Sequence, residues 1–373
     1  DVEYTRAEDI IDYKYWDEGK LTWDDFQDTL SLKGGPSAFN AFLRIEKTEK
    51  RDGNTRTIRP EAQACFDKRH SFADRQIQNE NLLRLFQLKY DLLEMYRRRL
   101  QTELNLGVVG IAADNRTRQY MDLYTEQSKK AEQETENGQN EIKLQEWEFY
   151  VTKELIENPA PSIPRISPRR FGYGFYLGTG ASFPVGSIPD YWDPAWQINV
   201  GFDLAYANTH LLCDFSAGTA RTRQEIIVSN GQITDKWLRN GHNTYTSISL
   251  GIGQQLISTK YFALMPYVGC IWSGYSDQAK IQEGRNERTT LSYTNFNWTA
   301  GICFDYRFST TISLVPSFWR GHREIFTASI RTKLFINREQ YKNFNAIEGN
   351  MIRGCKLGFS VACLGFSRLL QIK

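Results

Sequence analysis

The sequence lacks any long apolar run. No stretch approaches the roughly 20 residues that a membrane-spanning helix needs, and 24% of the 373 residues are charged. If this chain crosses a membrane, it must do so as a closed β-barrel, because only a barrel satisfies every backbone polar group without a helix. The formal net charge is only +2, which gives no reason to expect nucleic acid or a polyanionic substrate as partner.

Residues typical of catalytic sites are also scarce. The sequence has no phosphate-binding loop, nucleotide fingerprint or Gly-x-Ser-x-Gly motif, and its 4 histidines are scattered. None of the 6 cysteines forms a CxxC or a Cys/His pair at metal spacing, so we expect no metal and no cofactor. Disulfides stay open for an oxidising compartment. The chain begins at Asp1, which we interpret as a mature form after removal of a signal peptide.

The second half of the chain is rich in segments that alternate between apolar and small or polar residues. Strand side chains point to opposite faces in turn, so one face of each such segment is apolar. The clearest example has the apolar positions Trp196, Ile198, Val200, Phe202, Leu204 and Tyr206, separated by Gln197, Asn199, Gly201, Asp203 and Ala205. Aromatic residues on one face and glycines and charges on the other are typical of a membrane barrel, apolar outside and polar inside.

This pattern predicts eight antiparallel strands, and therefore a transmembrane β-barrel over residues 171–373. Short turns, such as Ala207-Asn208-Thr209, alternate with long polar connections, such as Arg221–Gly241 and Ser276–Arg288. Short turns on one side and long loops on the other are expected of an outer-membrane barrel. The segment Thr310–Trp319 fits either a further strand or a connection. The expected strands begin near Phe171, Pro194, His210, Thr244, Lys260, Leu291, Glu324 and Gly354.

The small-residue face places ionisable residues inside the barrel. A barrel of eight strands is only wide enough for its side chains, and buried charges must be paired. We therefore predict a filled, charge-balanced interior rather than an ion path, with three acids and three bases: Asp203, Asp214, Asp305, Arg331, Lys333 and Lys356.

Aromatic residues near the expected strand ends suit a girdle at the two membrane interfaces. In a soluble β-sandwich, the structural alternative, the same residues would be core. The predicted girdle consists of Trp192, Trp196, Tyr206, Tyr261, Trp272, Tyr293 and Tyr306.

Residues 1–158 differ in composition and predict a separate α+β domain. Strands are expected around Ala38–Lys47 and Thr57–Phe66, followed by an amphipathic helix from Asn81 to about Leu104. The charged segment 116–157 predicts a helical hairpin that turns near Asn137-Gly138. A proline-rich linker, residues 159–170, then leads into the barrel.

Residues 16–105 resemble a known bacterial family. The order Leu-Thr-Trp-Asp-Asp-Phe at 21–26, a strand pair, and a helix ending in Glu-x-Tyr-x-Arg-Arg-Leu at 94–100 is similar to a family of unknown function identified as zinc-dependent proteases. The helix of that family carries His-Glu-x-x-His, which binds zinc and supplies a general base. Here Leu85, Phe86 and Lys89 stand at those positions. None of the three can do that chemistry, so the resemblance implies a degenerate, catalytically dead domain.

The same helix carries two acids, Asp91 and Glu94. A carboxylate metal site is conceivable there, but two acids at this spacing on an exposed helix face are usually solvated. We therefore expect a solvated face, with pairing to Arg97 or Arg98.

Together these features predict a periplasmic α+β domain followed by an eight-stranded barrel, in style similar to small outer-membrane barrels of Bacteroides-type bacteria. The leading hypothesis is a non-enzymatic scaffolding subunit of an envelope complex for outer-membrane protein assembly or transport, in contact with membrane lipid and with other outer-membrane or periplasmic proteins. Two alternatives stay open. One is an enzyme with a site at the barrel rim or with displaced metal ligands; the other is a surface receptor or adhesin whose long loops bind lipopolysaccharide through Arg221, Arg223, Lys236, Arg239, Arg285 and Arg288.

Overall fold

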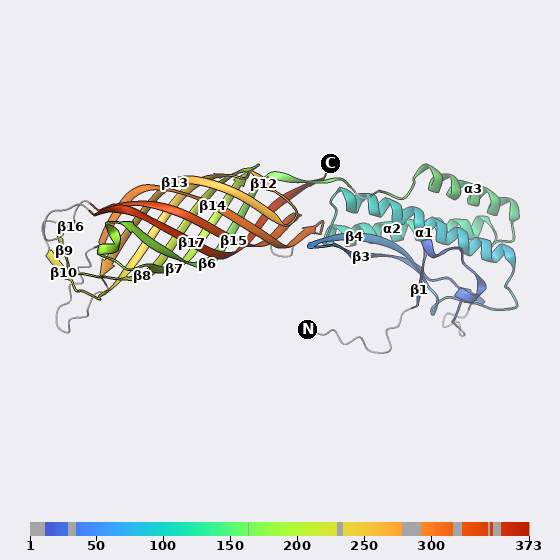
Figure 1. Cartoon of the computed structure of the whole chain (residues 1–373). Coiled ribbons are helices and arrows are strands. Elements are labelled where there is room, and N and C mark those ends of the chain that lie inside the picture. The colour runs from blue at the N-terminus through green and yellow to red at the C-terminus, as the bar shows by residue number, and fades with distance from the viewer. Residues whose placement is uncertain are drawn as a thin grey trace.

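The computed structural model describes residues 12–28, 35–162, 164–229, 234–277, 292–315, 323–341, 344–345 and 352–372. A long β-barrel and an N-terminal domain of sheet and helices lie end to end (Figure 1). The C-terminal strand ends beside the N-terminal domain, at the end of the barrel where the chain first enters it (Figure 1). The end of the barrel that adjoins this domain is called the near end, and the opposite one is called the far end.

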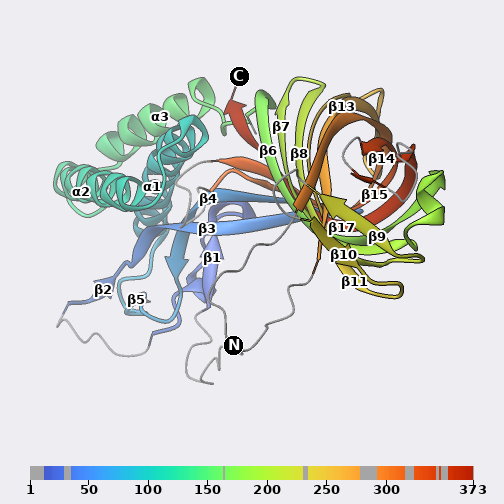
Figure 2. The same ribbon diagram turned by 90° about the vertical axis from the view of Figure 1, so that its left-hand side faces the viewer.

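The barrel is a closed ring of antiparallel strands, which confirms the expected eight. Each strand pairs with the next along the chain, and the last pairs with the first from Ile372↔Ile166 to Gly354↔Gly186. Figure 2 shows the barrel beside the helices of the N-terminal domain. The strands are β6 (Ile166–Gly186), β7 (Ala195–Tyr206), β8 (Thr209–Arg221), β11 (His242–Gln254), β13 (Phe262–Asp277), β14 (Ser292–Ser313), β15 (Glu324–Tyr341) and β17 (Ile352–Ile372).

The alternation of the sequence becomes two faces of the barrel wall. On β7, the side chains of Trp196 and Ile198 point outward and are 65% and 61% exposed. Asp203 points inward and is fully buried, although both of its chain neighbours point outward. The outward residues of the other barrel strands are likewise large and apolar. Free cysteines follow the same rule, because Cys213 and Cys363 point outward and Cys303 points inward.

One expectation about the strand boundaries is wrong, and one of the two possibilities left open for Thr310–Trp319 is excluded. Strand β6 begins at Ile166, so residues 166–170 of the predicted 159–170 linker belong to the barrel wall, with Pro168 opposite Leu370. The segment Thr310–Trp319 is not a strand of its own, because Thr310–Ser313 completes β14; residues 316–322 lie outside the described part of the chain.

The near end carries the shortest connection between neighbouring barrel strands. Strands β7 and β8 are joined by the two residues Ala207-Asn208, and Ala207 adopts a φ of 54° that closes the turn. The far end carries longer connections, and part of them forms a small sheet. Its strands are β9 (Ile226–Ser229), β10 (Thr234–Trp237) and β16 (Phe344–Asn345).

The N-terminal domain packs helices on one face of an antiparallel sheet. The sheet consists of β1 (Tyr13–Tyr15), β3 (Ala41–Asp52) and β4 (Thr55–Asp67). Helix α1 (Glu80–Leu106) lies against it, and α2 (Ile111–Glu134) and α3 (Glu141–Glu157) pack on α1. A separate two-stranded sheet pairs β2 (Ser37–Ala38) with β5 (Phe72–Ala73).

The termini of α1 follow from local residues. The Asn79 side chain accepts a hydrogen bond from the Leu82 amide at the start, and Gly107, with a φ of 123°, ends the helix. The apolar face of α1 supplies Leu85, Phe86 and Leu92 to the domain core. None of the helices within the described residues is long and apolar enough to cross a bilayer.

The two parts share one sheet. Strand β4 pairs in parallel with the end of β14, from Thr310↔Thr55 to Ser313↔Ile58. The Asn54 side chain at the tip of the β3–β4 hairpin also donates hydrogen bonds to the backbone carbonyl oxygens of Arg307 (2.9 Å) and Lys260 (3.2 Å). The N-terminal domain is therefore attached by backbone pairing and by the hairpin tip, in addition to its covalent link.

Candidate functional site

The barrel interior holds three groups of charged residues, one below the other along its axis. The group closest to the near end is centred on Arg331. Its Nε and Nη2 donate to both oxygens of Asp305 at 2.7 and 2.9 Å, and Nη2 also donates to Asp203 at 2.7 Å. His210 Nδ1 lies 2.7 Å from the other oxygen of Asp203. All four residues are buried.

The middle group joins Lys333 to Asp214. Lys333 Nζ lies 2.7 Å from Asp214 Oδ2, and the Tyr176 hydroxyl donates to Asp214 Oδ1. Gly201 makes room for the Tyr176 ring, because a Cβ at residue 201 would overlap that ring. A small inward residue on one strand thus accommodates a large inward residue on its neighbour.

The far group pairs Lys356 with Glu339 at 3.1 Å and sits beneath aromatic rings. Lys356 Nζ lies 3.4 Å from the centre of the Tyr245 ring, and Tyr275 stacks on Trp192 with centroids 4.3 Å apart. These rings belong to a buried apolar cluster that closes this end of the barrel. Its members are Ile188, Trp192, Ala195, Ala220, Ile226, Trp237, Tyr245, Tyr275, Tyr341 and Ile352.

The structure brings all six predicted interior charges inside and pairs each of them. The sequence analysis missed Glu339, His210 and the inward tyrosines. Alternation could have found the first two, because Glu339 shares the parity of Arg331 and Lys333 on β15, and His210 shares that of Asp214 on β8. With Glu339 included, the buried acidic and basic side chains among the described barrel residues are four carboxylates, two lysines, one arginine and one histidine.

The predicted aromatic girdle is only partly as expected. Trp196, Tyr206, Trp272 and Tyr306 are 65%, 62%, 45% and 43% exposed on the outer face. Tyr261 is 42% exposed but precedes β13, and its hydroxyl lies beside Gly53 at the tip of the β3–β4 hairpin. The prediction for Trp192 is wrong, because this residue lies outside the regular strands and is fully buried in the cluster that closes the far end. Tyr293 lies in β14, but its side chain is outside the described part of the structure.

The positions matched to the zinc motif lie on α1 and are buried in the domain core. Leu85 and Phe86 are 1% and 4% exposed. Lys89 forms an ion pair with Glu132 of α2 and lies 4.6 Å from the centre of the Phe39 ring. Burial lowers the pKa of Lys89, although Glu132 opposes that shift. Within the described residues, no group of three or more His, Cys, Asp or Glu is placed to hold a metal ion.

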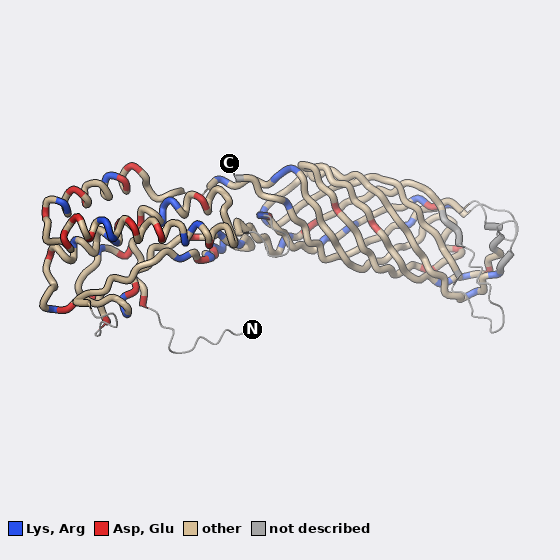
Figure 3. The backbone as a smooth tube through the Cα atoms, turned by 180° about the vertical axis from the view of Figure 1, so that it is seen from behind, with Lys and Arg blue, Asp and Glu red and all other residues tan. Residues whose placement is uncertain are grey.

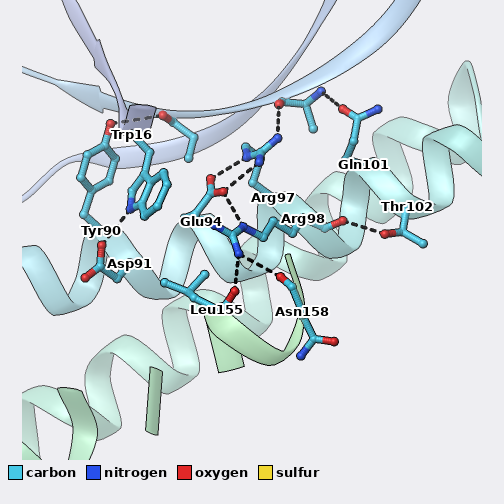
Figure 4. Close-up of polar contacts among 12 residues, drawn as sticks. Trp16, Tyr90, Asp91, Glu94, Arg97, Arg98, Gln101, Thr102, Leu155 and Asn158 are labelled. Atoms are coloured by element: carbon cyan, nitrogen blue, oxygen red, sulfur yellow. Dashed lines mark hydrogen bonds and ion pairs between the residues drawn. The ribbon is translucent and has the colours of Figure 1, made fainter. Parts of the chain in front are cut away.

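A cleft of about 440 Å³ lies between α1, β4 and residues 160–162 and 164, which lead to the barrel. Glu94 is 1% exposed at this cleft, and it binds Arg97 and Arg98 at 2.5 and 2.8 Å (Figure 4). Arg98 also donates to the backbone carbonyl oxygens of Leu155 and Asn158, at 2.6 and 2.9 Å. The pairing with both arginines is as expected, but the expectation of a solvated face at Glu94 is wrong. Its carboxylate is buried and holds Arg98, and Arg98 ties α1 to the end of α3.

Asp91, one turn before Glu94, is held by Trp16. The Trp16 indole N–H donates to Asp91 Oδ1 at 2.8 Å (Figure 4). Gln87 donates to the same oxygen at 2.8 Å. Burial raises the pKa of Asp91, and the two hydrogen bonds oppose that rise. These contacts fix the N-terminal segment against the helix and serve the packing of the domain.

The basic residues of the long loops are partly neutralised. Arg223 pairs with Asp193 at 2.6 Å and Lys236 pairs with Glu225 at 2.7 Å. Arg221 and Arg239 are exposed, whereas Arg285 and Arg288 lie outside the described residues. The described part of these loops therefore offers less free positive charge than the sequence predicts.

Comparisons with known proteins give structural neighbours only. No protein-family model and no curated protein matches the sequence. Among solved structures, the chain is similar to the attachment invasion locus protein Ail of Yersinia pestis in complex with the heparin analogue sucrose octasulfate (TM-score 0.28, 9% identity, covering 53% of this chain and 99% of that chain). It is also similar to the N-terminal β-barrel domain of Pseudomonas aeruginosa OprF (TM-score 0.25, 9% identity, 53% and 99%). A major outer membrane protein of Thermus thermophilus is a further neighbour (TM-score 0.25, 11% identity, 53% and 98%). These values are too low to transfer any property from those proteins to this chain.

Proposed function

We propose that this chain is a non-enzymatic outer-membrane protein that mounts a periplasmic binding domain on the membrane. The observation that carries this proposal is the combination of an apolar outer wall with a filled, ion-paired interior. An outer wall of this kind would be unfavourable in water, where exposed apolar patches of a few hundred Å² already mark interaction sites. In a bilayer it faces hydrocarbon, as the walls of outer-membrane barrels do.

The connections support an orientation with the N-terminal domain in the periplasm. Outer-membrane barrels have short turns on the periplasmic side and longer loops outside. The two-residue turn at Ala207-Asn208 lies at the near end, and the long connection that contains β9 and β10 lies at the far end. The pairing of β4 with β14 would hold the domain at a fixed position below the membrane.

The outer face of α3 supports a role in binding another protein. Ile142, Phe149 and Ile156 recur every seven residues on this helix and are 72%, 73% and 73% exposed. Side chains at this spacing form one stripe along a helix. We propose that this stripe contacts an apolar surface of another envelope protein in a complex for outer-membrane protein assembly or transport. The degenerate protease-like domain would then act as a scaffold, and no cofactor is proposed.

The test is extraction of the tagged native protein in mild detergent, followed by mass spectrometry of co-purifying proteins. We expect a membrane protein at near-stoichiometric yield from the wild type and its loss from Phe149→Glu. Gln133→Glu, at an exposed position of α2 away from the stripe, introduces the same charge and should keep the partner. Recovery of the wild type alone, as a stable detergent-bound monomer, would overturn the scaffolding role. Extraction without detergent would overturn the membrane location.

A further inference from the structure

The near end of the barrel is open to a cavity, in contrast to the aromatic far end. The cavity has a volume of about 390 Å³, and it is bordered by the tip of the β3–β4 hairpin at Thr55. Figure 3 shows Lys and Arg on the strands at this end of the barrel. The charged residues and the histidine that line the cavity are His210, Lys260, Asp305, Arg307, Arg331 and Arg368.

Two buried nitrogen atoms of this lining have no partner among the described residues. Arg331 is 1% exposed, and its Nη1 makes no hydrogen bond, although its Nε and Nη2 are fully used. His210 is 5% exposed; its Nδ1 contacts Asp203, and its Nε2 has no partner. Buried polar groups in folded proteins are nearly always paired. Nη1 is always a donor, so it requires an acceptor at this place.

The cavity also has an excess of positive charge. Arg307 donates to the carbonyl oxygen of Thr259 at 2.7 Å, and Arg368 donates to that of Ala207 at 2.6 Å. Neither guanidinium forms an ion pair with a described carboxylate, and the two repel each other. Both oxygens of Asp305 are engaged by Arg331. Three guanidiniums therefore face the two carboxylates of Asp203 and Asp305, while Lys260 is paired with Asp52 at 3.1 Å.

We propose that this cavity binds a phosphate-type oxyanion. Arg307 and Arg368 supply planar guanidinium donors, the geometry that suits phosphate and other oxyanions, and Arg331 Nη1 supplies a further donor at the inner wall. Water could satisfy Nη1 but would leave the excess charge uncompensated. The anion is either free in solution or the headgroup of a phosphorylated lipid, because the cavity opens at the end of the barrel wall.

The first arm of the test is calorimetric titration of the full-length protein in a non-ionic detergent with inorganic phosphate. We expect saturable binding of one anion. The variant Arg307→Gln/Arg368→Gln should weaken it by roughly tenfold or more, because charge-assisted hydrogen bonds are lost. The control variant Arg221→Gln/Arg239→Gln, which removes two exposed arginines at the far end, should bind like the wild type.

Since Arg307 and Arg368 also hold turn carbonyl oxygens, a second variant leaves them in place. Thr327 lines the cavity, and Thr327→Asp would add a competing carboxylate there without removing any arginine. Its folding is checked by heat-dependent gel mobility. Loss of binding in this folded variant supports the proposal, and unchanged binding overturns it.

The second arm separates the two sources of the anion. The full-length protein is placed in vesicles of phosphatidylcholine with or without phosphatidic acid, and lipid binding is measured for the wild type and for Thr327→Asp. Binding of phosphatidic acid but not inorganic phosphate, lost in the variant, assigns the site to a lipid headgroup. If neither ligand binds the wild type, or if both bind every variant equally, the cavity is not an anion site.

Discussion

At the scale of single residues, Arg331 neutralises two buried carboxylates of the barrel interior. Its guanidinium is the only group that bonds to both Asp203 and Asp305 within the described residues. Replacing a buried ion pair by apolar residues can be neutral, but removing one partner leaves an uncompensated buried charge. For this reason the two carboxylates would be unfavourable in the interior without Arg331.

We therefore predict that Arg331→Met destabilises the barrel by about 3–5 kcal/mol, the usual loss when one partner of a buried pair is removed. Urea unfolding in detergent micelles, followed by heat-dependent gel mobility, measures it. The matched control is Arg223→Met, since Arg223 is paired with Asp193 at 2.6 Å but exposed; exposed pairs contribute little. Equal stability of both variants would show that Arg331 does not compensate the two acids.

Lys89 allows a second prediction at the residue scale, with a defined pH dependence. Its pKa is lowered by burial in the folded domain, so between the folded value and its ordinary 10.5 the unfolded chain binds more protons. Within that window, the contribution of Lys89 becomes more favourable to folding as pH rises. Lys89→Met should thus stabilise the N-terminal domain at pH 7, and this gain should shrink as pH approaches 10.5.

Tryptophan fluorescence during urea unfolding, compared for wild type and Lys89→Met at pH 7 and pH 10, measures this effect. The buried tyrosines and Cys65 also make the free energy of unfolding depend on pH, but they do so equally in both proteins. Their contribution therefore cancels when the stability of the wild type is subtracted from that of the variant. A gain that stays constant or grows with pH would contradict a burial-lowered pKa at Lys89.

At the scale of elements, the sequence predicts the barrel strands well, but it does not predict their pairing with the N-terminal domain. Period-two alternation predicted the start of every barrel strand except β6 within a few residues, because the inward and outward faces meet different surroundings along the whole strand. It failed for Trp192, which lies outside the strands, and for the start of β6, where Pro164 and Pro168 resembled a linker. The parallel pairing of β4 with β14 has no local signature, because edge pairing depends on which strands meet in space.

The candidate sites follow the same division. The interior acids and bases could be listed from parity alone, but their pairing could not, because Arg331 joins strands β7, β14 and β15. Burial of Glu94 was missed since its two arginines looked like part of a charged helix face. In each case the residue pattern indicates the face on which a side chain lies, and the tertiary fold decides what it meets there.

The β3–β4 hairpin yields a prediction at this scale. Asn54→Ala removes the side-chain hydrogen bonds to Arg307 and Lys260 at the barrel rim. A net loss of about 1 kcal/mol should open the junction roughly fivefold more often. Tryptic cleavage after the exposed Arg165 should accelerate accordingly, as followed by mass spectrometry. Lys50→Ala, on the same hairpin but pointing to solvent, should not change this rate. Identical cleavage in both variants would mean that β4–β14 pairing alone holds the domain.

At the scale of the whole molecule, the barrel is a cup rather than a channel. The far end is closed by the stacked rings of Trp192 and Tyr275, and ion pairs fill the space below them. An ion that crossed would have to displace Lys356 from Glu339 and then Lys333 from Asp214, each in a desolvated interior. The cavity at the near end is consequently blind.

This arrangement predicts that the purified protein gives no steady ion conductance in a planar bilayer. Trp192→Ala/Tyr275→Ala, which opens the aromatic closure, should still not conduct, because the two lower ion pairs remain. Adding Lys356→Ala/Glu339→Ala and Lys333→Ala/Asp214→Ala removes both pairs as well. Conductance should appear only in this combined variant if it inserts as a folded barrel, which heat-dependent gel mobility establishes. Steady conductance by the wild type would show that the charged interior is a path for ions, and the scaffolding role would then lose the filled barrel on which it rests.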